Sequence, residues 1–356
     1  MKNILKPLFI SIGMLCTVGV FIGCKKEESN LSEPSTNPNP QEISPGQGAA
    51  GEVLTLKGTG LGGIKMIYFE KDSIEATLNP NFNTDHAVIF RIPDDAIPAD
   101  QNIVFINYKD VKFTVPFKVL GLPNILEVSN YNFKGNGELT LTGKNFADIS
   151  EAKFVKDEQA VIQIVSKTAT SITLKIPVVE FTQSKLILTN EAGSITSKDD
   201  FVNLDKALVL FYEDMEQGLV NGSWGPAEVS SEAAKSGTHS FKMTYNKGNW
   251  SANGFANWSG GINVPVEYTY ISFWLKGGTS DQTLYITSNT RNVAYGNSDR
   301  NTELIVKANK WNYFKLKTAD IDQFVNGRNI VQLGFWLPGP DDANQNIYLD
   351  DLIFIK

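Results

Sequence analysis

The chain has 356 residues, of which 32 are Lys or Arg and 39 are Asp or Glu, so its formal net charge is −7. An acidic chain without a cluster of basic residues is a poor partner for nucleic acid or another polyanion, because phosphate binding requires a basic patch. The length is sufficient for two or three domains with packed cores.

Residues 1–23 have the pattern of an export signal. Lys2 and Lys6 give a positive start, and residues 7–22 are an uncharged apolar run, shorter than the roughly 20 residues that span a membrane. The segment FIGC that ends at Cys24 resembles a lipobox, in which the peptidase cuts before a lipid-modified cysteine, although Phe replaces the usual Leu. We therefore expect a signal peptide over residues 1–23 and a lipid anchor at Cys24.

The segment after Cys24 is polar and rich in Pro, Asn and Ser. It cannot bury enough apolar surface to offset the entropy of ordering, so residues 24–44 are predicted to be a disordered tether. Its first residues, CKKEE, are similar to the charged signal that directs lipoproteins of Gram-negative gut bacteria to the outer face of the outer membrane. This resemblance implies a lipid-anchored protein that faces the cell exterior. The only other cysteine, Cys16, lies in the signal, so no intramolecular disulfide is expected.

The next part of the chain contains an internal repeat. Residues 53–69 (VLTLKGTGLGGIKMIYF) match residues 138–155 (ELTLTGKNFADISEAKFV), with Gly58 aligned to Gly143. Further on, FRIP and IVFIN in the first copy match LKIP and LILTN in the second. Both copies alternate polar and apolar residues and are interrupted by Gly, Asn, Asp and Pro, which is typical of a small antiparallel β-sandwich.

Both copies resemble the immunoglobulin-like IPT/TIG family, whose pattern includes a Gly-x-Asn/Gly-Phe/Leu turn after a strand. The turn is GTGL at residues 58–61 and GKNF at residues 143–146. The resemblance implies two tandem immunoglobulin-like sandwiches, at residues 45–120 and 121–204. Such modules commonly act as stalks or spacers, and neither copy contains Trp or a catalytic cluster.

Residues 205–356 have a different composition, because they contain all six Trp residues. About eight strand candidates with little helical periodicity predict a jelly-roll β-sandwich. The segments YLDDL and SGTHSF are similar to those of jelly-roll carbohydrate-binding modules. The candidates are residues 208–212, 240–245, 269–276, 283–287, 302–307, 311–316, 330–337 and 347–355.

Two tryptophans in these strands are predicted to point away from the core. A sugar ring has an apolar C–H face that an exposed aromatic ring can desolvate, while polar side chains bind its hydroxyls. Strand alternation places Trp274 and Trp336 on the face opposite the apolar residues of their strands. An outward Trp is costly to leave in water without a ligand, so both are candidate sugar platforms, although Trp is also a common core residue.

Other candidates lie in stretches that have no core pattern. Residues 248–261 surround Trp250 and Trp258 with Asn, Ser and Gly, and this loop-like composition resembles that of antibody paratopes. Trp224 lies in a similar turn. Arg291 and Tyr295 occupy a third, Asn-rich turn. The predicted glycan-binding residues are therefore Trp224, Trp250, Trp258, Trp274, Trp336, Arg291 and Tyr295.

The order of these parts resembles that of the surface glycan-binding proteins of starch-utilisation-system-like loci, especially members with a C-terminal β-glucan or xyloglucan-binding domain. The resemblance spans the whole chain. It implies a non-catalytic protein that needs no cofactor and captures a neutral plant or microbial polysaccharide at the cell surface. It further implies partnership with an outer-membrane importer and a surface glycanase.

Two other functions stay open. A surface glycoside hydrolase or lyase is one, and a hydrolase would require two facing carboxylates in the acid-rich terminal domain. Asp214, Glu216 and Asp350, however, have the positions at which jelly-roll modules hold a structural Ca²⁺ ion. The two histidines, His86 and His239, are in different predicted domains and cannot form a His-based metal site. The other alternative is a protein-binding adhesin or scaffold with the same fold.

Overall fold

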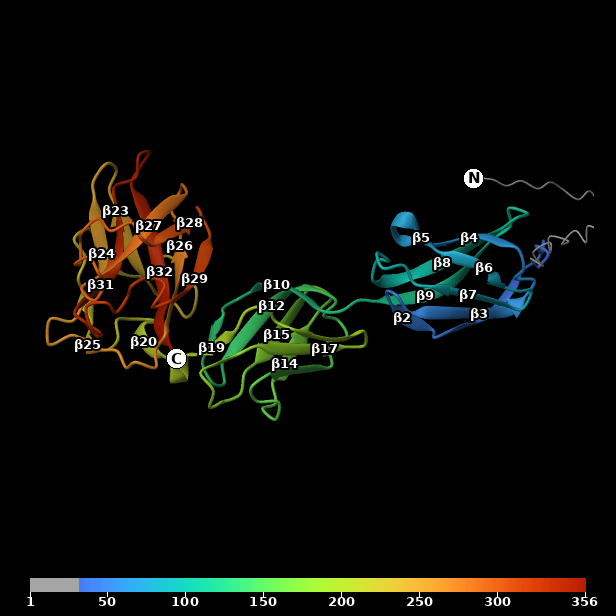
Figure 1. The fold of residues 1–356 in the computed structure, drawn as a ribbon, viewed down its shortest axis with the longest axis horizontal. Coiled ribbons are helices and arrows are strands. Elements are labelled where there is room, and N and C mark those ends of the chain that lie inside the picture. Colours follow the sequence, from blue (N-terminus) through green and yellow to red (C-terminus); the bar gives the residue numbers. More distant parts are fainter. Residues whose placement is uncertain (1–31) are drawn as a thin grey trace, which may run out of the picture. The chain divides into compact units, whose positions relative to one another are not determined.

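The computed structural model describes residues 32–356. The predicted signal peptide at residues 1–23, the anchor Cys24 and the start of the tether lie outside these residues. The described chain consists of β-strands and two short 3-10 segments, which confirms the predicted all-β class (Figure 1). It divides into two compact units. The first consists of the described residues up to Ala96 together with Asp100–Lys118, and the second consists of Ile97–Ala99 together with Val119–Lys356.

The first unit is a β-sandwich, referred to below as the first sandwich. Buried residues such as Leu56, Val88, Ile67 and Phe105 fill the space between its two sheets. A short 3-10 segment, η1 (Lys71–Ser73), follows β4. One sheet has the order β1 (Asn39–Ser44), β3 (Val53–Thr59), β7 (Ala87–Arg91), β6 (Leu78–Asn83), and the other has the order β2 (Gln47–Ala49), β9 (Lys112–Leu120), β8 (Ala99–Asn107), β4 (Ile64–Phe69), β5 (Ile74–Ala76).

The end of the predicted tether is folded, which corrects the prediction of disorder up to residue 44. β1 pairs antiparallel with β3, so the backbone of a polar segment gains hydrogen bonds that its side chains do not provide. The segment before β1 is also held, because Asn107 Nδ2 donates to the Ser35 carbonyl at 2.7 Å. Composition predicts poor burial, but an edge strand needs little burial when its partner strand is already in place.

The second sandwich repeats this arrangement. Its core includes Leu141, Phe146, Phe154, Ile172 and Leu188. The 3-10 segment η2 (Leu204–Lys206) leads out of it. One sheet has the order β10 (Asn124–Val128), β12 (Glu138–Lys144), β15 (Ser171–Lys175), β14 (Gln163–Lys167). The remaining strands form two three-stranded sheets. The first has the order β13 (Glu151–Phe154), β17 (Leu186–Asn190), β18 (Gly193–Thr196), and the second has the order β11 (Asn132–Phe133), β19 (Phe201–Asn203), β16 (Gln183–Ser184).

The aligned glycines of the repeat have a common structural cause. Pro40 and Ile125, at the bulges of β1 and β10, lie opposite Gly58 and Gly143. A Cβ atom on either glycine would collide with a backbone carbonyl oxygen of the bulged strand. In the following turn, Gly60 and Asn145 both have positive φ, 68° and 60°. The sequence motif therefore marks a close backbone approach followed by a left-handed turn residue.

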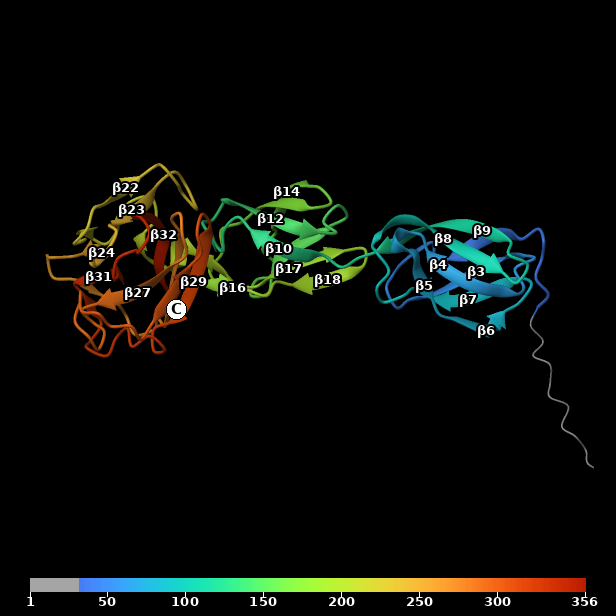
Figure 2. The same cartoon turned by 90° about the horizontal axis from the view of Figure 1, so that it is seen from above.

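The C-terminal domain is a larger sandwich of two sheets around one core, which includes Phe241, Phe255, Phe273 and Phe335 (Figure 2). The small pair β25 (Ile262–Asn263) and β30 (Asn329–Ile330) lies outside both sheets. Sheet F has the order β22 (Ala227–Ser230), β23 (Ser240–Tyr245), β32 (Gln345–Ile355), β26 (Tyr270–Lys276), β29 (Trp311–Lys317), with β20 (Leu208–Phe211) on β32, and sheet G has the order β21 (Val220–Asn221), β24 (Ser251–Ala256), β31 (Gln332–Leu337), β27 (Gln282–Ser288), β28 (Glu303–Val306).

Two strands of sheet G, the two-residue β21 and the longer β24, are absent from the sequence prediction. β24 lies within residues 248–261, which were predicted to be loop-like, and all of its residues are buried. Its small residues allow it to pair between β21 and β31. Trp250 and Trp258 flank this strand on its two sides. Pairing with existing strands decides this element, because its Ser, Asn, Gly and Ala residues carry no strand signal of their own.

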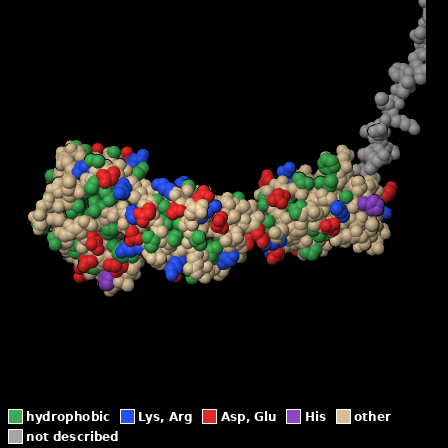
Figure 3. Space-filling model, turned by 90° about the horizontal axis from the view of Figure 1, so that it is seen from below, with side chains coloured by type: hydrophobic (Ala, Val, Ile, Leu, Met, Phe, Trp, Pro, Cys, Tyr) green, Lys and Arg blue, Asp and Glu red, His purple; other side chains and the backbone are tan. Residues whose placement is uncertain are grey.

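The surface of the chain carries both signs of charge. Figure 3 shows Lys and Arg side chains interspersed with Asp and Glu side chains on the face drawn. Within residues 32–356, no helix has the length and apolar character needed to cross a bilayer.

Candidate functional site

An aromatic cluster lies on the face of sheet G that points away from the core. Trp336 is opposite Ala252 on β24 and opposite Tyr285 on β27, so the three side chains form a row across the sheet. The Trp336 and Tyr285 rings are stacked, with centroids 4.6 Å apart. Trp250 packs against the same cluster, with its ring centroid 6.1 Å from that of Trp336.

A segment between β27 and β28, residues 289–302, covers part of this cluster. Trp336 Nε1 donates to the Asp299 carbonyl at 3.0 Å. Arg291, near the start of the segment, has a buried side chain whose Nη1 forms a 3.1 Å ion pair with Asp299 and whose Nη2 donates to Thr302. Burial lowers the pKa of the Arg291 guanidinium, while the Asp299 charge acts in the opposite direction. Trp336 therefore ties the covering segment to sheet G, and Arg291 links the start of the segment to its end.

The prediction that Trp336 and Arg291 are exposed glycan contacts is wrong, because the segment 289–302 folds over this face. Trp336 is fully buried, and Arg291 is 1% exposed. The alternation argument placed Trp336 on the correct face, since Leu333, Phe335 and Leu337 belong to the core. It could not show that residues 289–302 fold back over that face.

Trp224 and Trp250 form the open side of the cluster. Trp224 is 58% exposed, and Trp250 is half-buried. Their ring centroids are 5.5 Å apart, and Trp224 meets Tyr295 edge-on at 5.7 Å. The backbone of Trp224 is fixed because its N–H donates to the Ala252 carbonyl at 2.8 Å. The chain thus holds an exposed indole against an aromatic cluster without covering it.

Two donors in this cluster lack partners. The indole Nε1 of Trp250 and the hydroxyl of Tyr295 are buried and have no hydrogen bond within residues 32–356. Tyr295 is 8% exposed, so it supports Trp224 rather than offering a surface of its own as the sequence predicted. Burial raises the pKa of its hydroxyl far above the ordinary value, which keeps the hydroxyl protonated. An unpaired buried donor costs about 1–3 kcal/mol, a cost that a ligand acceptor would remove.

Trp258 lies beyond the opposite end of β24. It is 64% exposed, and neighbouring Asn257 donates through Nδ2 to the Gln217 carbonyl at 3.0 Å. The Trp224 N–H bonds to Ala252 near the start of β24, and Trp258 comes two residues after its end, so the strand places the two backbones about 15–20 Å apart. The sequence predicted both as exposed aromatic residues, and the structure exposes both.

Trp274 is buried at a joint between the second sandwich and the C-terminal domain. Its Nε1 donates to Asn130 Oδ1 at 2.9 Å, and its ring stacks on Tyr131. Only 5% of the residue is exposed. The prediction of an open sugar platform is therefore wrong for Trp274. Its orientation away from the domain core is as predicted, but another domain of the same chain covers it.

Two carboxylates are buried in the same joint. Asp351 Oδ2 accepts hydrogen bonds from Asn130 and Asn132, and its Oδ1 accepts one from Ser236. Asp350 Oδ2 accepts from the backbone N–H groups of Lys235 and Ser236. Asp350, predicted as a calcium ligand, therefore anchors the 235–236 turn to β32.

The predicted calcium ligands do not converge. Asp214 and Glu216 are exposed, and Asp214 Oδ1 accepts a hydrogen bond from the Met215 backbone N–H. Across residues 32–356, no group of three or more His, Cys, Asp or Glu side chains is placed to hold a metal ion. A structural calcium ion remains a prediction from the sequence alone.

The buried carboxylates predict a pH dependence of stability. The pKa of Asp350 is raised to about 8, chiefly by burial and next by the Asp351 charge, while hydrogen bonds from backbone N–H groups oppose the rise. The unfolded side chain titrates near pH 3.9, so between about pH 4 and pH 8 the folded protein binds more protons. The free energy of unfolding should therefore decrease as pH rises through this window.

Asp350→Asn should flatten this decrease, because the amide stays neutral and keeps an acceptor for the Lys235 N–H. Urea unfolding at about pH 5 and about pH 8, with both proteins, measures the difference. Equal pH slopes for the variant and the wild type would contradict this assignment.

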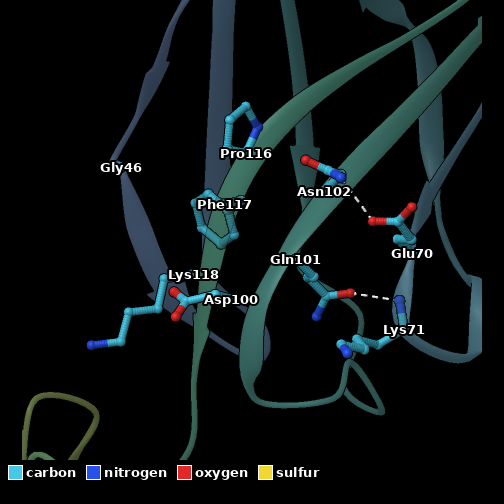
Figure 4. Close-up of a pocket in the computed structure, with 9 residues that line it drawn as sticks. All are labelled: Gly46, Glu70, Lys71, Asp100, Gln101, Asn102, Pro116, Phe117 and Lys118. Atoms are coloured by element: carbon cyan, nitrogen blue, oxygen red, sulfur yellow. Dashed lines mark hydrogen bonds between the residues drawn. The ribbon is translucent and has the colours of Figure 1, made fainter.

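A polar hollow lies on the first sandwich. It has a volume of about 550 Å³ and is lined by residues of β8 and β9, by Glu70 and Lys71 after β4, and by Gly46 before β2 (Figure 4). Asn102 Nδ2 donates to Glu70, and the Lys71 N–H donates to Gln101, both at 2.8 Å. The one aromatic residue in the lining, Phe117, is 4% exposed. This hollow offers hydrogen bonds but no ring for a sugar face, so the C-terminal domain has the better chemistry for a glycan.

No known protein family and no curated protein matches the sequence. Solved structures do resemble it. A surface glycan-binding protein from Prevotella bryantii has a TM-score of 0.46 and 16% identity, over 91% of this chain and 99% of that one. A protein of a Bacteroides uniformis xyloglucan utilisation locus has a TM-score of 0.44 and 16% identity, over 90% and 99%. One from a Bacteroides ovatus mixed-linkage glucan utilisation locus, bound to a heptasaccharide, has a TM-score of 0.33 and 14% identity, over 90% and 76%.

Proposed function

We propose that this protein is a non-catalytic, cell-surface polysaccharide-binding protein that captures a neutral glycan of the β-glucan or xyloglucan type. The observation that carries the proposal is the pair of exposed indoles, Trp224 and Trp258, with half-buried Trp250 beside Trp224. Exposed, backbone-fixed aromatic rings can desolvate the apolar face of a sugar at low entropic cost.

The acidic residues beside the cluster favour binding over hydrolysis. Asp299 is buried in its ion pair with Arg291. Glu303 is exposed and lies opposite Tyr285 across the β27–β28 pair. Glycoside hydrolysis requires two carboxyl groups that flank one glycosidic bond. Of these two acids only Glu303 is exposed, and a single carboxylate at the edge of an aromatic surface supplies a hydrogen-bond acceptor rather than such a pair.

The proposal includes attachment to the outer membrane through a lipid on Cys24, with the glycan site facing the exterior. It also includes delivery of the bound polysaccharide to an importer and a surface glycanase. Its support is the signal pattern of residues 1–23 and the following CKKEE segment. The two sandwiches before the C-terminal domain would then act as spacers between the lipid and the site.

The test is affinity electrophoresis of residues 25–356 against xyloglucan, mixed-linkage β-glucan and β-mannan, together with an assay for released reducing sugar. Retardation without release is the expected result. Release of reducing ends would favour a hydrolase, and neither retardation nor release would favour a protein-binding scaffold.

Trp224→Ala should weaken glycan binding by about 1–3 kcal/mol, in the range expected for an exposed aromatic hot spot. The melting temperature should change little, since the ring is 58% exposed. Tyr108→Ala is the matched control, because Tyr108 is an aromatic residue of the first sandwich with 62% exposure. An equal loss of affinity in the control variant would place the binding site elsewhere.

A further inference from the structure

The aromatic cluster on sheet G has a cation at one edge. The Arg300 guanidinium lies 5.7 Å from the Tyr285 ring centroid and 5.8 Å from that of Trp336. Arg300 is exposed, and its guanidinium has no hydrogen bond or ion pair with any residue of 32–356. Its five N–H donors are fixed in a plane and are available to a ligand.

The backbone around Arg300 is held on both sides. Asp299 accepts from Trp336 through its carbonyl and pairs with Arg291 through its carboxylate. Thr302 is 9% exposed and accepts from Arg291 Nη2. An exposed arginine between two anchored residues loses less freedom when it binds than one on a mobile loop, because its backbone is already ordered.

We infer that Arg300 forms a polar subsite at the edge of the aromatic surface, where its planar fork donates paired hydrogen bonds to two adjacent hydroxyls of one neutral sugar residue. This inference rests on the proposed function and adds a residue and a recognition chemistry to it. Trp224 and Trp250 contact the ring face of the glycan, and Arg300 fixes its orientation. Aromatic stacking alone tolerates many orientations, whereas a guanidinium fork requires two acceptors at matched spacing.

The surrounding charges select a neutral sugar over a uronate. Glu303 lies three residues after Arg300 and opposite Tyr285, and it is exposed. The Asp299 carboxylate is adjacent in sequence and already shared with Arg291. A uronate at this edge would therefore be repelled by the Glu303 carboxylate, whereas a hydroxyl can donate to it; Asp299 adds no such repulsion, because Arg291 neutralises its charge.

The experiment is isothermal titration calorimetry of residues 25–356 with three polymers: xyloglucan, mixed-linkage β-glucan and polygalacturonate. Arg300→Gln and Arg300→Lys should each weaken binding of the neutral polymers about ten-fold, because neither side chain has the planar fork. Lys276→Gln is the control, since it removes a cation 5.5 Å from the Tyr348 ring on sheet F. All three variants should keep the wild-type melting temperature.

The possible results distinguish the Arg300 subsite from the proposed glycan-binding function. If Arg300→Lys binds the neutral polymers with wild-type affinity, the paired hydrogen bonds from a planar guanidinium are contradicted, and only the positive charge of residue 300 matters. Binding of polygalacturonate that depends on Arg300 and weakens with salt would overturn the neutral hydroxyl pair. If Arg300→Gln binds normally while Trp224→Ala does not, the proposed function stands and this subsite falls. If the wild type binds none of these polymers, both fall.

Discussion

Trp336→Ala should lower the free energy of unfolding of the C-terminal domain by about 3–5 kcal/mol, the usual cost of removing a large buried aromatic side chain. Trp336 is fully buried beneath the segment 289–302 and stacks on Tyr285. Its removal would leave a cavity, free the Asp299 carbonyl from the indole N–H, and loosen the covering segment. Glycan affinity should fall as a consequence of this loosening, because Trp336 itself has no surface to offer a ligand.

Tryptophan fluorescence during denaturant unfolding is the measurement. All six tryptophans lie in residues 205–356, so the signal reports on this domain. Trp224→Ala is the matched comparison, since it removes an exposed indole that contacts the same cluster. An unchanged unfolding midpoint in Trp336→Ala, combined with lost binding, would show that this ring is uncovered in solution and contacts the glycan directly.

Trp274→Ala should be equally destabilising, but its effect should appear at the joint between the second sandwich and the C-terminal domain. The variant would lose the stack on Tyr131, the contact with Tyr313, and the hydrogen bond to Asn130. The expected cost is about 3–5 kcal/mol. Lys235 would also lose the aromatic ring over which its ammonium lies, 4.0 Å from the centroid.

Differential scanning calorimetry can separate loss of the joint from general unfolding. In the wild type, the second sandwich and the C-terminal domain should unfold in one transition, because they share the Trp274 contacts and the Asp351 hydrogen bonds. In Trp274→Ala, two transitions are expected. Trp274→Phe is the control, since it keeps an aromatic ring for the stack on Tyr131 while losing the N–H donor and part of the ring volume, so its cost should be smaller than that of Trp274→Ala. A single, unshifted transition in Trp274→Ala would show that the joint carries little stability.

Rigid coupling at this joint would serve the proposed function. An apolar cluster of Val202, Leu204, Ile353 and Ile355 lies beside the polar contacts, so both kinds of interaction connect the two domains. Lys315 Nζ adds a contact with Gln183 at 2.6 Å. The last spacer and the binding domain would then move as one body.

Local patterns in the sequence were enough to predict the class and most strands of the C-terminal domain. The period-2 alternation gave the strands of the C-terminal domain, for instance β23 at the predicted residues 240–245 and β29 within one residue of its predicted end. The repeat correctly predicted two matching sandwiches, because at both Gly58 and Gly143 a backbone carbonyl oxygen comes too close for any side chain. Alternation also placed Trp274 and Trp336 correctly away from the core, since the faces of a strand follow directly from its backbone geometry.

Exposure, in contrast, was decided by tertiary structure. Trp274 and Trp336 have the same sequence pattern as a sugar platform, but one is covered by Asn130 and Tyr131 of another domain and the other by residues 289–302. Arg300 became a candidate only when folding placed it over Tyr285 and Trp336. A strand pattern specifies the direction of each side chain. What lies in that direction depends on distant segments of the chain, which no local pattern encodes.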